Sequence, residues 1–97
     1  PPRPWLGTFT AETMGKVVIV GTWKGGPAES AGLEAGDMVI GVDDKPVDGM
    51  AEFFRSVWSL GSAGIEVPLN IYRDGDLITV TVRSRARGEF YKSPNLH

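Results

Sequence analysis

Cysteine is absent from the 97-residue sequence, and histidine occurs once, as the last residue. Without cysteine the chain forms neither disulfides nor thiolate metal sites. The absence of cysteine does not identify the cellular compartment, since many envelope proteins also lack cysteine. A Ser–His–Asp triad needs a positioned imidazole, which His97 at the chain end is poorly placed to supply. No His, Asp and Glu residues have the spacing of metal ligands. We therefore expect no catalytic residue, no metal and no cofactor in this chain.

Long apolar runs and an excess of basic charge are also missing. The longest apolar run is Val17–Val20, whereas a membrane-spanning helix needs about 20 apolar residues. The formal net charge is −2, which gives no basic excess for a phosphate backbone. We expect neither membrane insertion nor nucleic-acid binding. No signal peptide is recognisable, and since the chain starts with Pro1 instead of Met, we expect a segment of a longer protein.

The residues that are present suit one small globular domain, with 41% hydrophobic and 23% charged residues. Alternating and 3.6-residue apolar periods predict its elements. We expect strands over 8–12, 17–22, 38–42, 67–72 and 77–82, a short helix over 28–31 and a long helix over 51–60. Asp74-Gly75 between the last two strands is typical of a hairpin turn. The pattern predicts an α+β domain, a small antiparallel sheet closed by two helices.

A run of some twenty residues in the middle of the chain carries the most specific signal. It reads Gly-Pro-Ala-Glu-Ser-Ala-Gly-Leu-Glu-Ala-Gly-Asp-Met-Val-Ile-Gly-Val-Asp-Asp-Lys-Pro-Val over residues 26–47. Gly32 ends a helix, Gly36 makes a tight turn, and Asp37 can hydrogen-bond the backbone of that turn. This order resembles PDZ domains of the bacterial HtrA-like, trypsin-like serine proteases, over roughly residues 4–83.

The resemblance divides the chain into a linker (1–4), a PDZ domain (5–83) and a C-terminal tail (84–97), with a PDZ-like half-barrel as the fold. Basic side chains, including Arg73, Arg83, Arg85 and Arg87, gather in the last quarter of the chain. We interpret them as a solvated face, the alternative being a functional patch. The tail over 84–97, which ends in residues 93–97, would be long enough to reach the domain's own groove or a neighbour's, although a frayed, solvated tail is the simpler expectation.

The resemblance also implies a peptide-binding groove between one strand and the long helix. The family's aromatic–aliphatic–Gly–aliphatic loop corresponds to Trp5-Leu6-Gly7-Thr8. Successive backbone N–H groups in such a loop form a concavity that binds anions, here a peptide's terminal carboxylate. The peptide would then add as a strand along residues 8–12. Arg3 is either an attractor for that carboxylate or a solvated linker charge.

Two features of the groove are open at this stage. Thr8 and Thr10 stand where aliphatic residues are usual, so the pocket is either more polar than usual or Phe9 rotates into it. The long helix carries two apolar stripes. We assign 53, 57 and 60 to the core and Phe54 and Trp58 to the groove wall, the alternative being that all five are core.

Two functions fit this resemblance. One is the substrate-binding or regulatory module of a bacterial serine endopeptidase in the periplasm or cell envelope, which acts on unfolded or mislocalised proteins. Its partners would be C-terminal peptides or unfolded protein segments, and an upstream protease domain of the same chain. The other is an interaction domain of a scaffold or secretion protein without a protease. The choice between them rests on analogy, because one fold serves many functions.

Overall fold

A computed structural model describes residues 1–91 of the chain. The elements in chain order are β1 (Thr8–Thr13), β2 (Lys16–Thr22), α1 (Pro27–Ala31), β3 (Met38–Val42), β4 (Lys45–Pro46), α2 (Met50–Ser59), β5 (Glu66–Arg73), β6 (Asp76–Arg83) and α3 (Arg87–Tyr91). Every strand and helix expected from the sequence is present, to within one or two residues at each end. The structure adds two short elements, β4 and α3.

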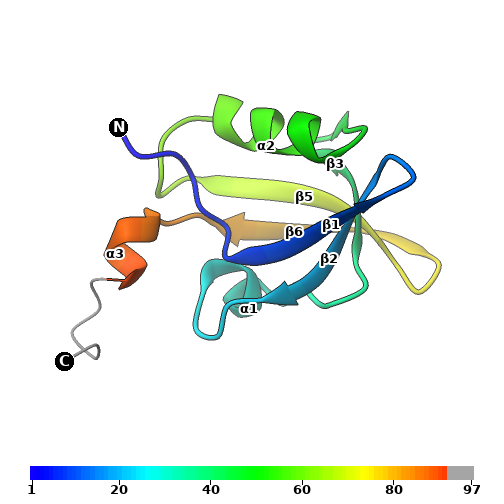
Figure 1. Cartoon of the computed structure of the whole chain (residues 1–97), viewed down its shortest axis with the longest axis horizontal. Coiled ribbons are helices and arrows are strands. Elements are labelled where there is room, and N and C mark those ends of the chain that lie inside the picture. The colour runs from blue at the N-terminus through cyan, green and yellow to red at the C-terminus, as the bar shows by residue number, and fades with distance from the viewer. Residues whose placement is uncertain (92–97) are drawn as a thin grey trace.

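The strands form one antiparallel sheet in the order β1-β2-β3-β5-β6, with β4 paired to β3. Figure 1 shows α2 along one open side of the curled sheet and α1 at the opposite side. The predicted antiparallel α+β fold is confirmed. β1 is an edge strand of the sheet that residues 1–91 form. The contacts of Thr10 and Glu12 with Met50 place this edge next to α2.

The core lies between the curled sheet and α2. The inner stripe of α2 supplies Phe53 and Val57, which are 0% and 1% exposed. Its neighbours in the core are the inward-facing residues of the strands, among them Ile19, Leu69 and Ile71. The 3.6-residue period of α2 therefore separates a fully buried stripe from an outer stripe, as an amphipathic helix requires.

One buried carboxylate ties the turn after α1 to the sheet. Asp37 is 1% exposed and accepts a hydrogen bond from the Glu34 N–H at 2.8 Å. Arg73 of β5 donates from Nε and Nη2 to its two oxygens, each at 2.8 Å, and also donates to the Gly32 carbonyl at 2.9 Å. The Arg73 side chain lowers the pKa of Asp37 chiefly through these hydrogen bonds, against the opposing effect of burial. Arg73, expected on a solvated face, instead pairs with a buried carboxylate and keeps only part of its side chain exposed, 24%.

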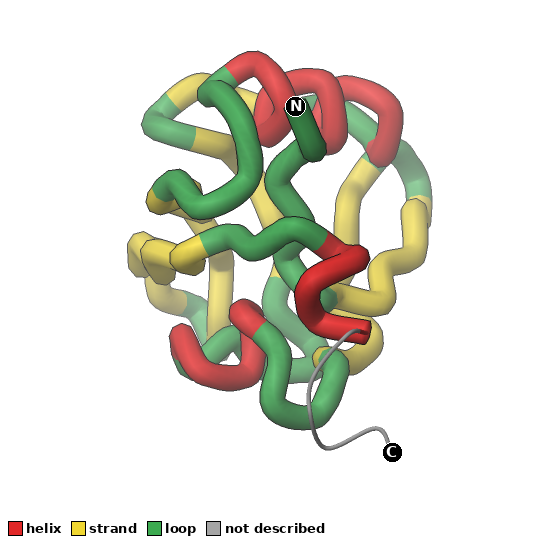
Figure 2. The backbone as a smooth tube through the Cα atoms, turned by 90° about the vertical axis from the view of Figure 1, so that its left-hand side faces the viewer, coloured by secondary structure: helices red, strands yellow, loops and turns green. Residues whose placement is uncertain are grey.

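The residues after β6 pack against the domain. Ser84 and Ala86 are 1% and 7% exposed, and the Ser84 hydroxyl donates to the Ile65 carbonyl at 2.8 Å. A two-way backbone bridge joins Trp5 to Arg85 at 2.9 and 3.1 Å, and α3 follows. Figure 2 shows α3 across the end of the domain, between α2 above and α1 below. An irregular tail was expected over 84–91. The Trp5–Arg85 bridge and the burial of Ser84 and Ala86 instead hold this segment against the domain. Residues 93–97, for which a frayed tail was the simpler expectation and occupancy of a groove the alternative, lie outside the described residues.

Candidate functional site

A groove of about 360 Å³ lies between the loop that leads into β1 and the outer face of α2. Its lining consists of residues 4–9, Trp23, Phe54, Val57, Trp58 and Arg87. The sequence-predicted site residues other than Arg3 and Thr10 are thus brought together around one hollow. Within residues 1–91 there is no cluster of acidic or histidine side chains that could hold a metal ion, and no helix long and apolar enough to cross a membrane.

The loop from Trp5 to Thr8 lines the groove, and its carbonyl and N–H groups are used differently. The Leu6 carbonyl accepts a hydrogen bond from the Ala28 N–H at 2.8 Å, and the Gly7 carbonyl accepts one from the Trp23 N–H at 2.9 Å. The N–H groups of Leu6 and Gly7 donate to no acceptor among residues 1–91. Since Trp23 bonds to Gly7, Thr8 and Thr22 form a non-hydrogen-bonded pair, and the Thr8 N–H points away from β2. Three successive donors of this kind form an anion-binding concavity.

Gly7 is required by the shape of this loop. Its φ of +71° lies in the left-handed region, which glycine adopts without steric cost. A Cβ at this position would lie 3.0 Å from Cδ of Pro27. Pro27 is the first residue of α1, so the loop packs directly on the short helix. Any larger residue would strain the backbone and push the loop away from α1.

The phase of β1 decides which side chains face α2. The Thr10 hydroxyl donates to Sδ of Met50 on α2 at 3.1 Å, and Thr8 shares that face because alternate residues of a strand point the same way. The Phe9 ring lies on the other face and stacks on Trp23, with centroids 5.2 Å apart and planes at 22°. The hydroxyl-bearing residues Thr8 and Thr10 thus face α2, while Phe9 is also part of the groove lining.

The outer stripe of α2 forms the opposite wall. Phe54 and Trp58 stack with centroids 5.6 Å apart, and Trp58 is 37% exposed. The guanidinium of Arg3 lies 4.1 Å from the Trp58 ring centroid, in a hollow that Pro1, Pro2 and Arg55 also line. Arg3 therefore lies outside the groove lining, on the far side of Trp58.

Contacts between β1 and α2 close the groove toward the start of α2. The Met50 N–H donates to Oε1 of Glu12 at 2.6 Å, and the Thr10 hydroxyl donates to the sulfur of Met50. β1 and α2 therefore touch directly beyond Thr10. Without movement of α2, the open edge of β1 accommodates only the last few residues of an added strand.

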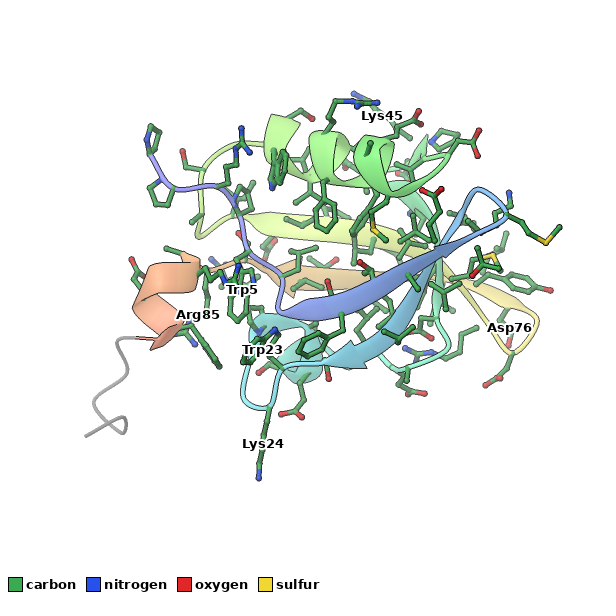
Figure 3. All side chains as sticks on the ribbon, in the orientation of Figure 1. Trp5, Trp23, Lys24, Lys45, Asp76 and Arg85 are labelled. Atoms are coloured by element: carbon green, nitrogen blue, oxygen red, sulfur yellow. The ribbon has the colours of Figure 1, made fainter. Side chains whose placement is uncertain are left out.

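Four lining residues were not among the predicted site residues: Pro4, which was assigned to the linker, Val57, which was assigned to the core, and Trp23 and Arg87. Trp23 comes directly after the bulged strand β2, where an aromatic residue beside glycines was the available signal. Arg87 had no signal beyond its charge. Figure 3 shows Trp5, Trp23 and Arg85 gathered where α3 meets the start of β1, and the ring centroids of Trp5 and Trp23 lie 6.0 Å apart.

An open edge strand beside an amphipathic helix, with a donor-lined glycine loop at the strand's start, defines a class of domain in which an extended chain adds to a sheet edge. A family model described as "PDZ domain" matches residues 4–83. The chain belongs to the PDZ domain family, as the resemblance implied.

The chain is similar to domains of several proteases. It is 32% identical over 78 residues to "Serine protease Do-like HtrA" of Bacillus subtilis, across 80% of this chain and 17% of that protein. It is 36% identical over 70 residues to "Carboxy-terminal processing protease CtpA" of the same organism, across 72% of this chain and 15% of that protein. A solved structure described as "HtrA-type protease AlgW with decapeptide" matches with a TM-score of 0.76 at 23% identity, across 89% of this chain and 30% of that one. The last match supports the fold alone.

Proposed function

We propose that the groove binds the free C-terminus of an extended peptide, or a hydrophobic segment of an unfolded protein, as a further strand on β1. The terminal carboxylate would accept hydrogen bonds from the N–H groups of Leu6, Gly7 and Thr8. The last side chain would lie between Thr8 and the rings of Phe54 and Trp58. Backbone pairing supplies affinity in this mode of recognition, and the pocket supplies specificity.

The observation that carries this proposal is the pair of buried backbone donors in the loop. Leu6 is 4% exposed, and buried N–H groups in proteins almost always have an acceptor. Those of Leu6 and Gly7 have none within the described part of the chain, residues 1–91. A ligand carboxylate satisfies such donors with charge-assisted hydrogen bonds.

The parent chain we propose is a serine endopeptidase of the cell envelope, in which this domain binds or senses substrates. Both relatives described above are proteases by name, which favours a protease over a scaffold protein. The upstream sequence tests this part: a trypsin-like domain with a Gly-Asn-Ser-Gly-Gly motif ahead of Pro1 is the expected result. An upstream region without any protease domain would leave the scaffold alternative in its place.

The groove itself is tested with one peptide in two forms. Titration of the domain with a peptide that ends in a hydrophobic residue, with a free or an amidated C-terminus, should give a micromolar dissociation constant for the acid. Amidation should weaken binding by about 1–3 kcal/mol, because it removes the charge from the hydrogen bonds at the loop. Calorimetry or tryptophan fluorescence gives both constants. Equal affinity for the two forms would exclude carboxylate binding by the loop.

A further inference from the structure

We infer that a clasp between β1 and α2 limits recognition to about the last three residues of a bound peptide, and that Glu12 is the specificity-determining residue for this limit. The clasp consists of Thr10 and Glu12 on β1 and Met50 on α2. This inference rests on the proposed function above and narrows its ligand to a short C-terminal sequence. A longer chain would leave the edge of β1 at the clasp.

The groove lining ends before the start of α2. From β1 it takes Thr8 and Phe9, and from α2 it takes Phe54 and residues beyond it. The three residues of the clasp are outside this lining. β1 runs on from the loop toward the start of α2 (Figure 1). The hollow therefore occupies only the part of the space between β1 and α2 that lies nearest the loop.

Two hydrogen bonds hold the clasp. The Met50 N–H donates to Oε1 of Glu12 at 2.6 Å, and the Thr10 hydroxyl donates to Sδ of Met50 at 3.1 Å. Oε1 of Glu12 also lies 3.0 Å from the position that a Cβ on Gly49 would take, so the carboxylate rests against the first turn of the helix. Glu12 thus reaches from the strand to the helix at the level where a longer added strand would continue.

Glu12 serves α2 in place of an N-cap side chain. The N-cap residue is Gly49, which has no side chain to cap the helix, and the first N–H groups of a helix have no partner within it. A carboxylate at this end is also favoured by the helix dipole. The start of α2 therefore depends on β1 for one acceptor, and this dependence stabilises the clasp while the groove is empty.

The position of the clasp along β1 sets the length of the pairing. Alternate residues of an edge strand turn their N–H and C=O groups to the open side, so Thr8, whose N–H points away from β2, is followed by Thr10 and then by Glu12. A terminal residue opposite Thr8 places the third residue from the peptide's end opposite Thr10. Pairing as far as Glu12 would bring the peptide against the side chain that crosses to Met50.

The test compares two acetylated peptides, three and six residues long, that share one C-terminal sequence with a free carboxylate. For the unmodified chain we expect dissociation constants within about twofold, because residues beyond the clasp find no free strand edge to pair with. Glu12→Ala removes the acceptor and should make the six-residue peptide bind about tenfold tighter than the three-residue one, the gain from one or two added strand hydrogen bonds. NMR titration measures both peptides, and their ratio cancels a general loss of stability in the variant.

Two variants separate the crossing contact from the charge and from the helix start. Glu12→Gln keeps a carbonyl oxygen that can accept from the Met50 N–H and should keep the ratio of the unmodified chain. Glu52→Ala removes a carboxylate from the first turn of the same helix, where Glu52 accepts from the nearby Asp48 N–H at 3.1 Å, and should also leave the ratio unchanged. Thermal melts check that the variants are folded.

The outcomes separate this inference from the proposed function, which the amidated six-residue peptide tests in parallel. If the unmodified chain prefers the acid to the amide but binds the six-residue acid much more tightly than the three-residue one, pairing continues past the clasp and the inference is overturned while the proposed function stands. An unchanged ratio in Glu12→Ala, or an equal rise in Glu52→Ala, would remove the specific role of Glu12. If acid and amide bind the unmodified chain equally, the proposed function fails and the inference fails with it.

Discussion

The turn from Glu34 to Asp37 and the loop from Trp5 to Thr8 are both short and contain a glycine with positive φ, yet they use their backbone donors in opposite ways. In the first, the Glu34 N–H donates to the buried carboxylate of Asp37, and the Gly36 N–H donates to the Ile19 carbonyl at 2.7 Å. In the second, the carbonyl groups are bonded while the N–H groups of Leu6 and Gly7 have no acceptor among residues 1–91.

The difference separates a turn that holds the fold from one that is suited to a ligand. The first turn supplies its own carboxylate, and Arg73 balances the charge at 2.8 Å. The second turn has backbone donors without an acceptor among residues 1–91, and it lines a hollow whose lining also includes Arg87. A group of the chemistry of Asp37, brought by another chain, would complete the second turn in the way that Asp37 completes the first.

The largest expected effect comes from removal of the internal carboxylate. Asp37→Ala leaves the Glu34 N–H without its acceptor and removes the buried partner of Arg73, which keeps its bonds to the Gly32 carbonyl and to Glu34. It should lower the free energy of unfolding by about 3 kcal/mol, the low end for one partner of a buried pair, because Arg73 keeps these partners and partial solvent access. Urea unfolding followed by tryptophan fluorescence measures this loss. Asp76→Ala, which removes an exposed carboxylate from the β5–β6 hairpin, should change stability by less than about 0.5 kcal/mol. Similar losses in both variants would contradict the structural role of Asp37.

The next effect distinguishes the two glycines. Gly7→Ala and Gly36→Ala both place a Cβ at positive φ, +71° and +96°, and each should cost about 1–2 kcal/mol of stability. Only at Gly7 would the Cβ meet a neighbour, Cδ of Pro27 at 3.0 Å, whereas nothing lies within 4 Å at Gly36. We therefore expect Gly7→Ala to weaken peptide binding about tenfold, the size of one charge-assisted hydrogen bond, and Gly36→Ala to leave it unchanged. Peptide titrations of the folded variants check this, and equal affinities would mean that the loop's shape is irrelevant to binding.

Much of the fold could be predicted from the sequence because it depends on local patterns. Apolar periods defined the strands and α2, and Gly32 and Asp74-Gly75 defined a helix end and a hairpin turn. The Asp37–Arg73 pair could not be predicted. Asp37 lies in the turn after α1 and Arg73 lies on β5, and strand register decides whether these two positions come close together. Local signals identified Asp37 as a turn residue and left its partner open.

The candidate site shows the same limit. The loop, β1 and α2 are recognisable from the resemblance and from the two stripes of α2. The face of β1 that meets α2 could be assigned only from the contact between Thr10 and Met50. The contribution of α3 depends on a bridge between Trp5 and Arg85, which lie at opposite ends of the domain's sequence. A helix of five residues has too few turns to show an apolar period, so residues 84–91 resembled a tail.

The smallest expected effect is the pH dependence of the internal turn. Because the hydrogen bonds from Arg73 lower the pKa of Asp37 in the folded chain, its carboxylate contributes stability that is fully present above the unfolded pKa of about 3.9. That contribution is lost as the pH falls through the lower, folded pKa. Asp37→Asn removes this one titration and leaves the other carboxylates in place.

The difference in unfolding free energy between the unmodified chain and Asp37→Asn, the stability gap, should therefore be constant from pH 7 to pH 5 and narrow as the pH falls below 4. Urea midpoints of both proteins across this range measure the gap. A gap that stays constant down to pH 3 would mean that the charge of Asp37 adds nothing to its hydrogen bonds, and the parallel between this turn and a carboxylate-binding loop would then rest on geometry alone.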